Sequence, residues 1–262
     1  MVLTVAVVLL AAVVWVFRGG SELEVTHHDM RGASWASAFR VVQLSDLHLQ
    51  RFGAAEKAVV TQVLTLQPDL VVLSGDAIDR ADALPLLQSF LQALGELAVV
   101  AVPGNWEHWS GVDFKALVAV LADRPAGRFL LNQRQSFVAK GRTVHVVGLD
   151  DFTAGRPDAQ MLSGPDLGDV RILVQHSPGF FDEREVARRM EGQRFTLCLS
   201  GHTHGGQVTL GGWAPVRPVG SGRFVAGFYD VPGCRLYVSR GLGTSVLPVR
   251  LGSVPEIAVF DL

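Results

Sequence analysis

The sequence predicts an α/β fold in which strands and helices alternate along the chain and pack in layers. From residue 40 onward, short runs rich in Val and Leu alternate with stretches whose apolar residues recur at helical spacing. Polar residues directly follow several of these runs, where α/β proteins commonly build their sites. With 262 residues, of which 48% are hydrophobic, the chain can bury a large core. We expect one α/β domain.

The predicted elements follow in chain order. Apolar runs that end at polar or glycine residues predict strands over 40–44, 69–73, 97–102, 143–149, 170–174 and 196–199. Helical spacing predicts helices over 55–66, 83–94, 113–121 and 179–190. After residue 204, Gly and Pro become frequent, and the pattern predicts β structure over 207–210, 235–239 and 256–260.

The N-terminal segment differs from the rest because residues 2–17 are apolar except for Thr4. As a helix this run would extend about 24 Å, slightly short of a bilayer core. A cleavable signal peptide and a buried core helix are the alternatives. We favour an uncleaved anchor over 1–20, because no Lys or Arg precedes Arg18 and the run ends in bulky residues. Residues 21–39 are then a linker or first strand, and 40–262 form the domain.

The charge balance bears on partners and on the side of the membrane. The 23 Lys and Arg are scattered among 25 Asp and Glu, which argues against a nucleic-acid partner. Arg18 follows the apolar run and, by the positive-inside rule, predicts an inner (cytoplasmic) membrane protein with its domain on the cytoplasmic side. The two cysteines, Cys198 and Cys234, imply no disulfide framework, and we expect Cys198 to be a buried small hydrophobe.

Candidate metal ligands follow five of the predicted strands. Residues at i and i+2 of an extended segment point the same way, so each Asp-x-His or His-x-His pair can address one point or two neighbouring points. Imidazole, carboxylate and amide donors without Cys suit Mn, Fe or Zn, and their number suits two ions that share a carboxylate. The seven residues are Asp46, His48, Asp76, Asn105, His176, His202 and His204.

These segments resemble the calcineurin-like metallophosphoesterase family over residues 46–204. The stretches 201–207, 239–245 and 247–251 are similar to its membrane-associated branch, which includes UDP-2,3-diacylglucosamine pyrophosphatases and related envelope phosphodiesterases. The resemblance implies a four-layer αββα sandwich and two divalent metal ions, Mn first, with Fe or Zn as alternatives. It also implies that one ion is held by Asp46, His48 and His204, the other by Asn105, His176 and His202, with Asp76 bridging both.

One position departs from the family pattern, which has His directly after the motif Asn. Here that position is Trp106, and an indole N–H cannot shuttle a proton at neutral pH. His108 is the candidate to replace it as the acid, and the alternative is that His108 packs between Trp106 and Trp109. We therefore take Asp76, Asn105 and His108 as the candidate catalytic residues.

Other polar residues give weaker indications of function. Asp79 and Arg80 orient a ligand or serve as a helix cap and a solvated charge, and these alternatives stay open. We expect Asp150 and Asp151 to form turns. For Arg240 and Arg250 we favour structural ion pairs over a phosphate clamp.

Together these features predict a dimetal phosphoric-ester hydrolase at the membrane. The expected reaction is cleavage of the pyrophosphate in a nucleotide-linked lipid precursor such as UDP-2,3-diacylglucosamine, because a good leaving group needs little protonation. A broad-specificity envelope phosphodiesterase or phosphatase is the alternative within the same chemistry. A non-catalytic metal-binding scaffold is the alternative from another class. The sequence predicts no oligomeric state.

Overall fold

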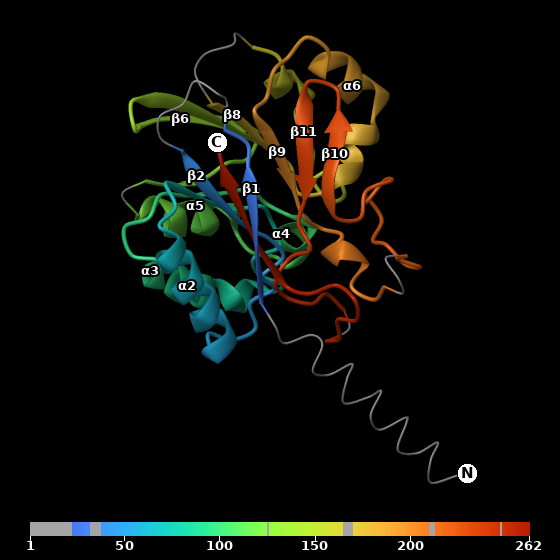
Figure 1. The fold of residues 1–262 in the computed structure, drawn as a ribbon. Coiled ribbons are helices and arrows are strands. Elements are labelled where there is room, and N and C mark those ends of the chain that lie inside the picture. Colours follow the sequence, from blue (N-terminus) through green and yellow to red (C-terminus); the bar gives the residue numbers. More distant parts are fainter. Residues whose placement is uncertain (1–22, 32–37, 125, 165–169, 210–212, 247) are drawn as a thin grey trace, which may run out of the picture.

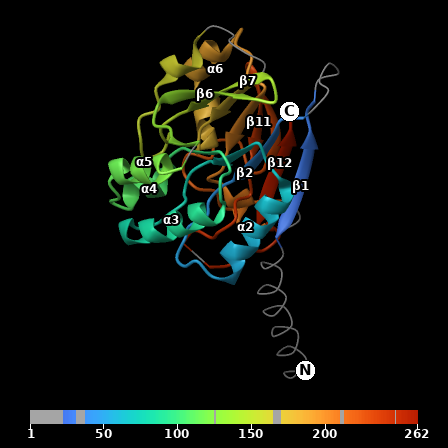
Figure 2. The same ribbon diagram turned by 90° about the vertical axis from the view of Figure 1, so that its left-hand side faces the viewer.

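The computed structural model describes residues 23–31, 38–124, 126–164, 170–209, 213–246 and 248–262. Two six-stranded mixed sheets face one another in these residues (Figure 1). Helices cover the outer face of each sheet, as the perpendicular view shows (Figure 2). The prediction of an α/β sandwich is therefore confirmed.

The first sheet has the strand order β1-β12-β2-β3-β4-β5. The strands β2 to β5 run parallel, β12 is antiparallel to β2, and β1 is parallel to β12. Their bounds are β1 Glu24–Asp29, β2 Arg40–Leu44, β3 Leu70–Leu73, β4 Val99–Ala101, β5 Gly127–Phe129 and β12 Glu256–Asp261.

The second sheet has the order β10-β11-β9-β8-β7-β6. The strands β7, β8, β9 and β11 are parallel, and antiparallel strands close both edges. Their bounds are β6 Gln133–Ala139, β7 Arg142–Gly148, β8 Val170–Val174, β9 Leu197–Ser200, β10 Gly227–Val231 and β11 Cys234–Val238.

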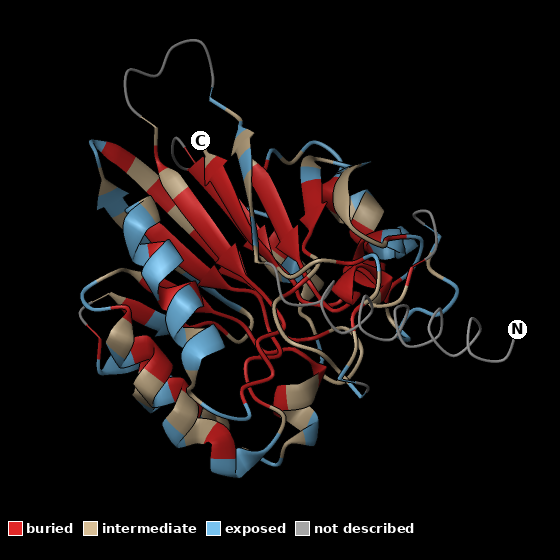
Figure 3. Ribbon diagram, turned by 60° about the horizontal axis from the view of Figure 1, so that its bottom comes forward, coloured by how far each residue is buried: buried red, intermediate tan, exposed pale blue. Residues whose placement is uncertain are grey.

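Three apolar cores separate four layers. On β2, Val42 and Leu44 face the helices while Val41 faces the second sheet, as period-two alternation requires. The outer core of the second sheet contains Phe180 and Met190. The covering helices are α2 Ala54–Leu66, α3 Leu84–Ala93 and α5 Phe114–Ala122 on the first sheet, and α6 Arg184–Met190 on the second; the short helix α4 spans Asn105–Trp109. Figure 3 shows the buried strands between exposed helix faces.

Most predicted elements coincide with observed ones. Residues 21–39, predicted to be a linker or a first strand, contain β1, which extends the first sheet. In the predicted strand over 207–210, Val208 makes only isolated bridges to residues 251 and 252. The predicted anchor over 2–17 lies outside the described residues. Within the residues that the structure describes, no helix has both the length and the apolar character required to cross a membrane.

The cysteines correct an expectation. Cys198 is buried, as predicted, but it forms a disulfide with Cys234, although no disulfide was expected. The pairing follows from topology, because β9 and β11 are neighbours in the second sheet. Their 36-residue separation gives no sign of this adjacency in the sequence.

Candidate dinuclear metal centre

The predicted ligands lie together where the two sheets meet. They follow β2, β3 and β4 in the first sheet and β8 and β9 in the second, because parallel strands direct their carboxyl ends to the same edge. Two buried groups result, and in each the ligand atoms lie within 4.8 Å of one another: Asp46, His48 and His204, and Asp76, His176 and His202.

Distances between donor atoms define the two groups. In the first, His204 Nε2 lies 3.1 Å from His48 Nε2 and 3.3 Å from Asp46 Oδ1. In the second, His176 Nε2 lies 3.1 Å from Asp76 Oδ2. The same Asp76 oxygen is 3.8 Å from His48 Nε2, so Asp76 lies between the groups. This position matches the shared carboxylate that two neighbouring ions need.

Asn105 joins the second group through its side-chain oxygen, which lies 2.8 Å from His202 Nδ1. The structure therefore brings together all seven residues that the sequence singled out as ligands. Their chemistry is that of a site for two divalent cations, with oxygen and imidazole donors from both sheets.

The outer nitrogens of three histidines fix which nitrogen faces the centre. Nδ1 of His176 contacts the Ser74 carbonyl at 2.7 Å, and Nε2 of His202 contacts the Val219 carbonyl at 2.7 Å. A carbonyl only accepts, so these nitrogens carry the protons and the opposite ones present lone pairs. Nδ1 of His48 is paired with Asp79 in the same way.

The inward lone pairs show that the residues fit metal ions. His176 Nε2 is buried without a hydrogen-bond partner, and it faces an Asp76 oxygen. His202 Nδ1 likewise faces an amide oxygen, although neither atom has a proton to donate. Acceptors that face acceptors in a buried site are satisfied by a proton or a metal ion between them, and a divalent ion satisfies several of them at once. Two bound divalent ions would supply the charge that activates water and stabilises phosphoryl oxygens.

The pKa values agree with this arrangement. Burial raises the pKa of Asp76, but the facing His176 and His48 outweigh it and hold the pKa below its usual range. Burial lowers the pKa of His204 to about 3, against the attraction of Asp46. For His176, burial is outweighed by Asp76 and Asp46, which raise the pKa well above its usual value. The second group therefore attracts positive charge.

The ligand loops have an unusual backbone. Five of the seven ligands have φ between 46° and 71°, the left-handed region that is rare outside glycine. Backbone hydrogen bonds hold this conformation, including Asp46 N to Gly75 O at 3.0 Å and His48 N to Asp76 O at 3.0 Å. Strained backbone at a site persists when its surroundings over-determine it. The five are Asp46, His48, Asp76, His202 and His204.

Glycines precede three of the ligands because the loops approach one another closely. A Cβ at Gly104 would lie 2.2 Å from Asp76 Oδ1, and one at Gly75 would lie 2.4 Å from His176 Nδ1. A Cβ at Gly201 would lie 2.5 Å from Asp46 Oδ2. The glycines that precede Asp76, Asn105 and His202 in the sequence therefore have a steric cause.

Glu107 is a functional residue to which sequence reasoning assigned no role. Its buried carboxylate accepts backbone N–H groups of Asp76, Ala77, Ile78 and Gly104 at 2.7–3.1 Å. It thereby joins the loop that carries Asp76 to the loop that carries Asn105. The signal was present in the Gly-Asn-Trp-Glu motif, where Glu107 occupies the third position of α4.

Asp79 and the two C-terminal arginines have clear positions. Asp79 pairs with His48 and so orients a ligand from outside. Arg240 forms ion pairs with Glu24 and Glu256, which confirms the structural interpretation. Arg250 instead donates to backbone carbonyls and to His204 Nδ1 at 3.2 Å; its role is structural, but the predicted ion pair is wrong within the described residues.

Trp106 and His108 diverge within α4. Trp106 lines the pocket beside the ligands, and its ring packs edge-on against His48 and Trp109. His108 is not among the pocket-lining residues, because its Nε2 lies 2.6 Å from Asp150 Oδ1 and its ring contacts Phe114. His108 does not pack between the two tryptophans either. Its role as a proton donor stays a prediction.

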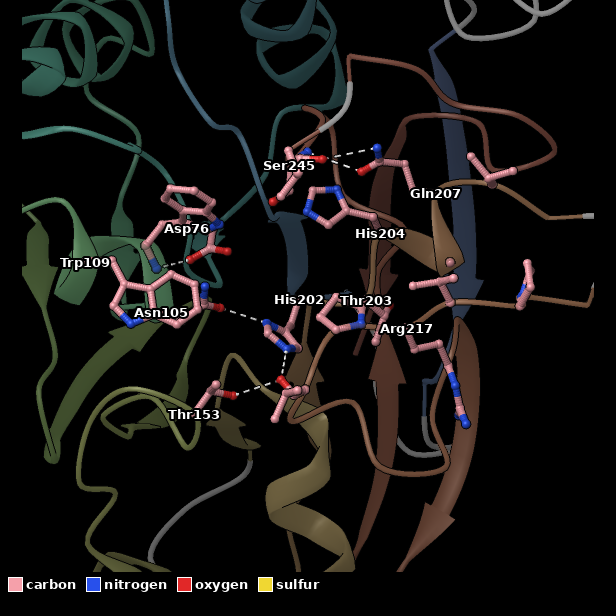
Figure 4. Close-up of a pocket in the computed structure, with 18 residues that line it drawn as sticks. Asp76, Asn105, Trp109, Thr153, His202, Thr203, His204, Gln207, Arg217 and Ser245 are labelled. Atoms are coloured by element: carbon pink, nitrogen blue, oxygen red, sulfur yellow. Dashed lines mark hydrogen bonds between the residues drawn. The ribbon is translucent and has the colours of Figure 1, made fainter.

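A pocket of about 740 Å³ opens onto the centre (Figure 4). Asp76, Asn105, His202 and His204 lie at its inner end. Its wall is largely apolar, and Arg217 supplies a guanidinium there. The other wall residues include Trp109, Val208, Pro215, Val216, Pro218, Val219 and Val246.

Comparisons with known proteins agree with this geometry. The model of the calcineurin-like phosphoesterase family matches residues 39–206. The uncharacterized metallophosphoesterase YkuE of Bacillus subtilis is 32% identical over 259 residues, covering 92% of this chain and 85% of the relative. Phosphodiesterase YaeI of Escherichia coli is 30% identical over 236 residues, covering 87% and 83%.

A solved structure supports the fold. The dimetal phosphatase from Danio rerio superposes with a TM-score of 0.52 at 13% identity, covering 78% of this chain and 88% of that one. At this identity the likeness concerns the fold alone. The family match, the bacterial relatives and the two ligand groups lead to one conclusion. The chain belongs to the calcineurin-like phosphoesterase family and is a metal-dependent hydrolase of phosphoric esters.

Proposed function

We propose that the protein cleaves a pyrophosphate or phosphodiester bond in an amphiphilic, lipid-linked substrate, such as UDP-2,3-diacylglucosamine. The pocket carries this proposal, because an apolar wall meets the two ligand groups and Arg217 in one cavity. A lipid-linked phosphoester needs such a combination: apolar surface for its acyl part and cationic groups for its phosphates.

The surroundings of the centre support a substrate with a good leaving group. Trp106 occupies the position where the family pattern has a proton-donating His, and His108 is turned towards Asp150. Because neither Trp106 nor His108 places a proton-donating imidazole from α4 in the pocket, a leaving oxygen that departs without protonation suits this site. A nucleotide phosphate or an aryl oxygen does this far more readily than an alkoxide.

Broad phosphodiesterase activity on envelope esters is the second candidate. The relative named phosphodiesterase YaeI favours it, since the name records no lipid precursor. Both candidates use the same centre and differ in what the pocket wall accepts. Mn is the proposed metal for both, because nitrogen and oxygen donors without thiolates suit it.

Residues 2–17 are proposed to anchor the chain to the inner membrane. The disulfide between Cys198 and Cys234 bears on which side of the membrane the domain occupies, because disulfides persist in oxidising compartments and are rare in the cytosol. It favours the outer side, opposite to the side that Arg18 predicts. Thiol labelling of the denatured protein from intact cells tests this: a protected Cys pair supports the outer side, and two free thiols support the cytoplasmic side.

The substrate is tested with the full chain in detergent. Release of UMP from UDP-2,3-diacylglucosamine is measured with Mn and after EDTA treatment, beside a soluble aryl phosphodiester. Metal-dependent UMP release is the expected result. Hydrolysis of the aryl diester without UMP release would replace the lipid pyrophosphatase with the broad phosphodiesterase.

A further inference from the structure

Exposed apolar side chains gather at the mouth of the pocket. Trp109, Trp213, Val216, Val219 and Val246 are 60–89% exposed, and they form five of the eight large hydrophobic side chains that are exposed in the described part of the chain. Four of them line the pocket, and Trp213 lies two residues before the wall segment 215–219. Contiguous exposed apolar surface beside a cavity is typical of an interaction site.

The charge around this mouth is one-sided. The two segments that form most of it, residues 201–229 and 239–255, contain four Arg and no Asp or Glu. Arg217 lies in the pocket wall and is exposed, while Arg223 pairs with Asp182, Arg240 pairs with Glu24, and Arg250 donates to backbone carbonyls. An exposed apolar surface with the Arg217 guanidinium beside it suits the anionic interface of a bilayer.

The attachment point of the N-terminal segment lies at the same end of the molecule. The Glu24 carboxylate pairs with Arg240 at 2.8 Å, and Glu24 N donates to Pro255 O at 2.9 Å. These contacts tie the start of β1 to the segment 239–255, which also carries Val246. Figure 1 shows the start of β1 beside this red loop, away from β6.

The tether to the apolar run is short. Seven peptide units separate Phe17 from Glu24, a reach of at most about 25 Å. If residues 2–17 lie in a bilayer, the pocket mouth is held close to its surface.

We propose that the surface formed by Trp109, Trp213, Val216, Val219 and Val246 lies against the lipid bilayer. The pocket then receives a phosphorylated head group while the acyl chains remain in the membrane. This inference rests on the proposed function, and it deepens it by specifying that the substrate enters from the bilayer. Aromatic side chains with apolar neighbours are well suited to the head-group region.

The test uses the full chain with Trp213→Cys or Val216→Cys, each labelled with an environment-sensitive dye. The native cysteines are joined in the disulfide, so the new thiol is the reactive one. Val138→Cys is the matched control, since Val138 is 78% exposed on β6, remote from the mouth. Each protein is reconstituted into vesicles of phosphatidylethanolamine and phosphatidylglycerol, with and without lipid that carries a nitroxide near its head group.

We expect the nitroxide to quench the dye at 213 and 216 at least threefold more than the dye at 138. Equal quenching at all positions would overturn the proposal, as would protein that does not float with the vesicles. The dyes at 213 and 216 could be shielded from water equally well without vesicles, in a protein whose mass in solution is doubled. That result would assign the surface to contact with a second copy of the chain and would also overturn the proposal. The measurement needs no turnover, so its failure is distinguishable from failure of the proposed hydrolysis.

Discussion

The ligand loops and the pocket wall lie side by side but are built by opposite means. The loops are buried, hold five ligands in a left-handed backbone, and are cross-linked by backbone bonds and by Glu107. The wall segments carry exposed valines and a tryptophan, and the polar contacts between them include Gln207 with Ser245 at 3.2 Å and Thr209 N with Leu251 O at 2.7 Å. The difference teaches that the fold fixes the metal chemistry, while the wall is free to set the substrate.

The largest effect is expected at Asp76, which lies between the two ligand groups. Asp76→Ala should lower kcat for an aryl phosphodiester by about 10³-fold or more, because both ions lose their shared ligand. Steady-state kinetics with bound-metal analysis measures this. A matched substitution in the wall, Val216→Ala, should leave bound metal unchanged. Metal lost equally from both variants would break the distinction between the two regions.

Glu107 sharpens the comparison because it supports the loops without being a predicted ligand. Glu107→Gln removes the acceptor for one or more of four backbone N–H groups and should lower metal affinity by about 10–100-fold. Activity should return at high Mn concentration. Lost activity that excess Mn does not restore would show that Glu107 acts on the reaction itself.

Restoring the family residue tests the pocket wall where Trp106 packs against the ligand His48. Trp106→His should raise turnover of an alkyl phosphodiester by about tenfold and change aryl diester turnover little, because only the poor leaving group needs a proton. Equal changes on both substrates would instead indicate altered binding. The ratio of the two kcat values is the readout.

The pH dependence of stability distinguishes protons from metals in the ligand loops. In the metal-free protein, Asp76 and Asp46 raise the pKa of His176 against burial, and the hydrogen bond with Asp79, followed by Asp76 and Asp46, raises the pKa of His48 against burial. Their folded forms keep protons that the unfolded chain loses near pH 6.5, so stability falls as pH rises from 6.5 towards 9. Thermal unfolding of the metal-free protein should show a Tm that is lower by several degrees at pH 9 than at pH 6.5.

Bound metal reverses this trend, because cations replace those protons. Mn-loaded protein should unfold at a higher temperature than metal-free protein at pH 9, with a smaller gap at pH 6.5. Burial lowers the pKa values of His202 and His204, so the unfolded chain binds protons at these residues more readily than the folded protein. Their contribution to stability therefore falls as pH drops below 6.5. Identical pH profiles with and without Mn would contradict this description of the loops.

The smallest effect is expected at His108, which lies outside both regions. His108→Ala should change aryl diester turnover by no more than about twofold, since its partner is Asp150 and it does not line the pocket. A loss of about 10²-fold would instead establish His108 as the leaving-group acid. The same variant measured on an alkyl diester provides the more sensitive comparison.

The metal ligands were predictable from sequence because each lies within a few residues of the end of an apolar run. That pattern places donors at strand ends, and strand ends of parallel sheets converge. The residues that hold the ligands in place were less predictable. Asp79 reaches His48, and Glu107 reaches four N–H groups, through turns whose course the sequence does not specify. Glu107 nevertheless stood in a recognisable motif.

The strands that escaped prediction are edge strands with mixed polarity. Strand β6 alternates exposed and half-buried residues, and β10 has one buried residue, so neither forms a long apolar run. The disulfide escaped for a different reason. It depends on β9 and β11 being neighbours, which follows from packing of the whole second sheet. The pocket wall has no regular periodicity, so its apolar surface appeared only with the fold.

The most direct test of the dinuclear centre is a titration of metal-free protein with Mn, with bound metal and aryl phosphodiester hydrolysis measured on the same samples. The account predicts that turnover reaches its maximum as the second ion binds each chain. Asp76→Ala should bind fewer ions and stay inactive. Full turnover in EDTA, or turnover that is complete before any metal is bound, would contradict the assignment of the two ligand groups as a catalytic metal centre.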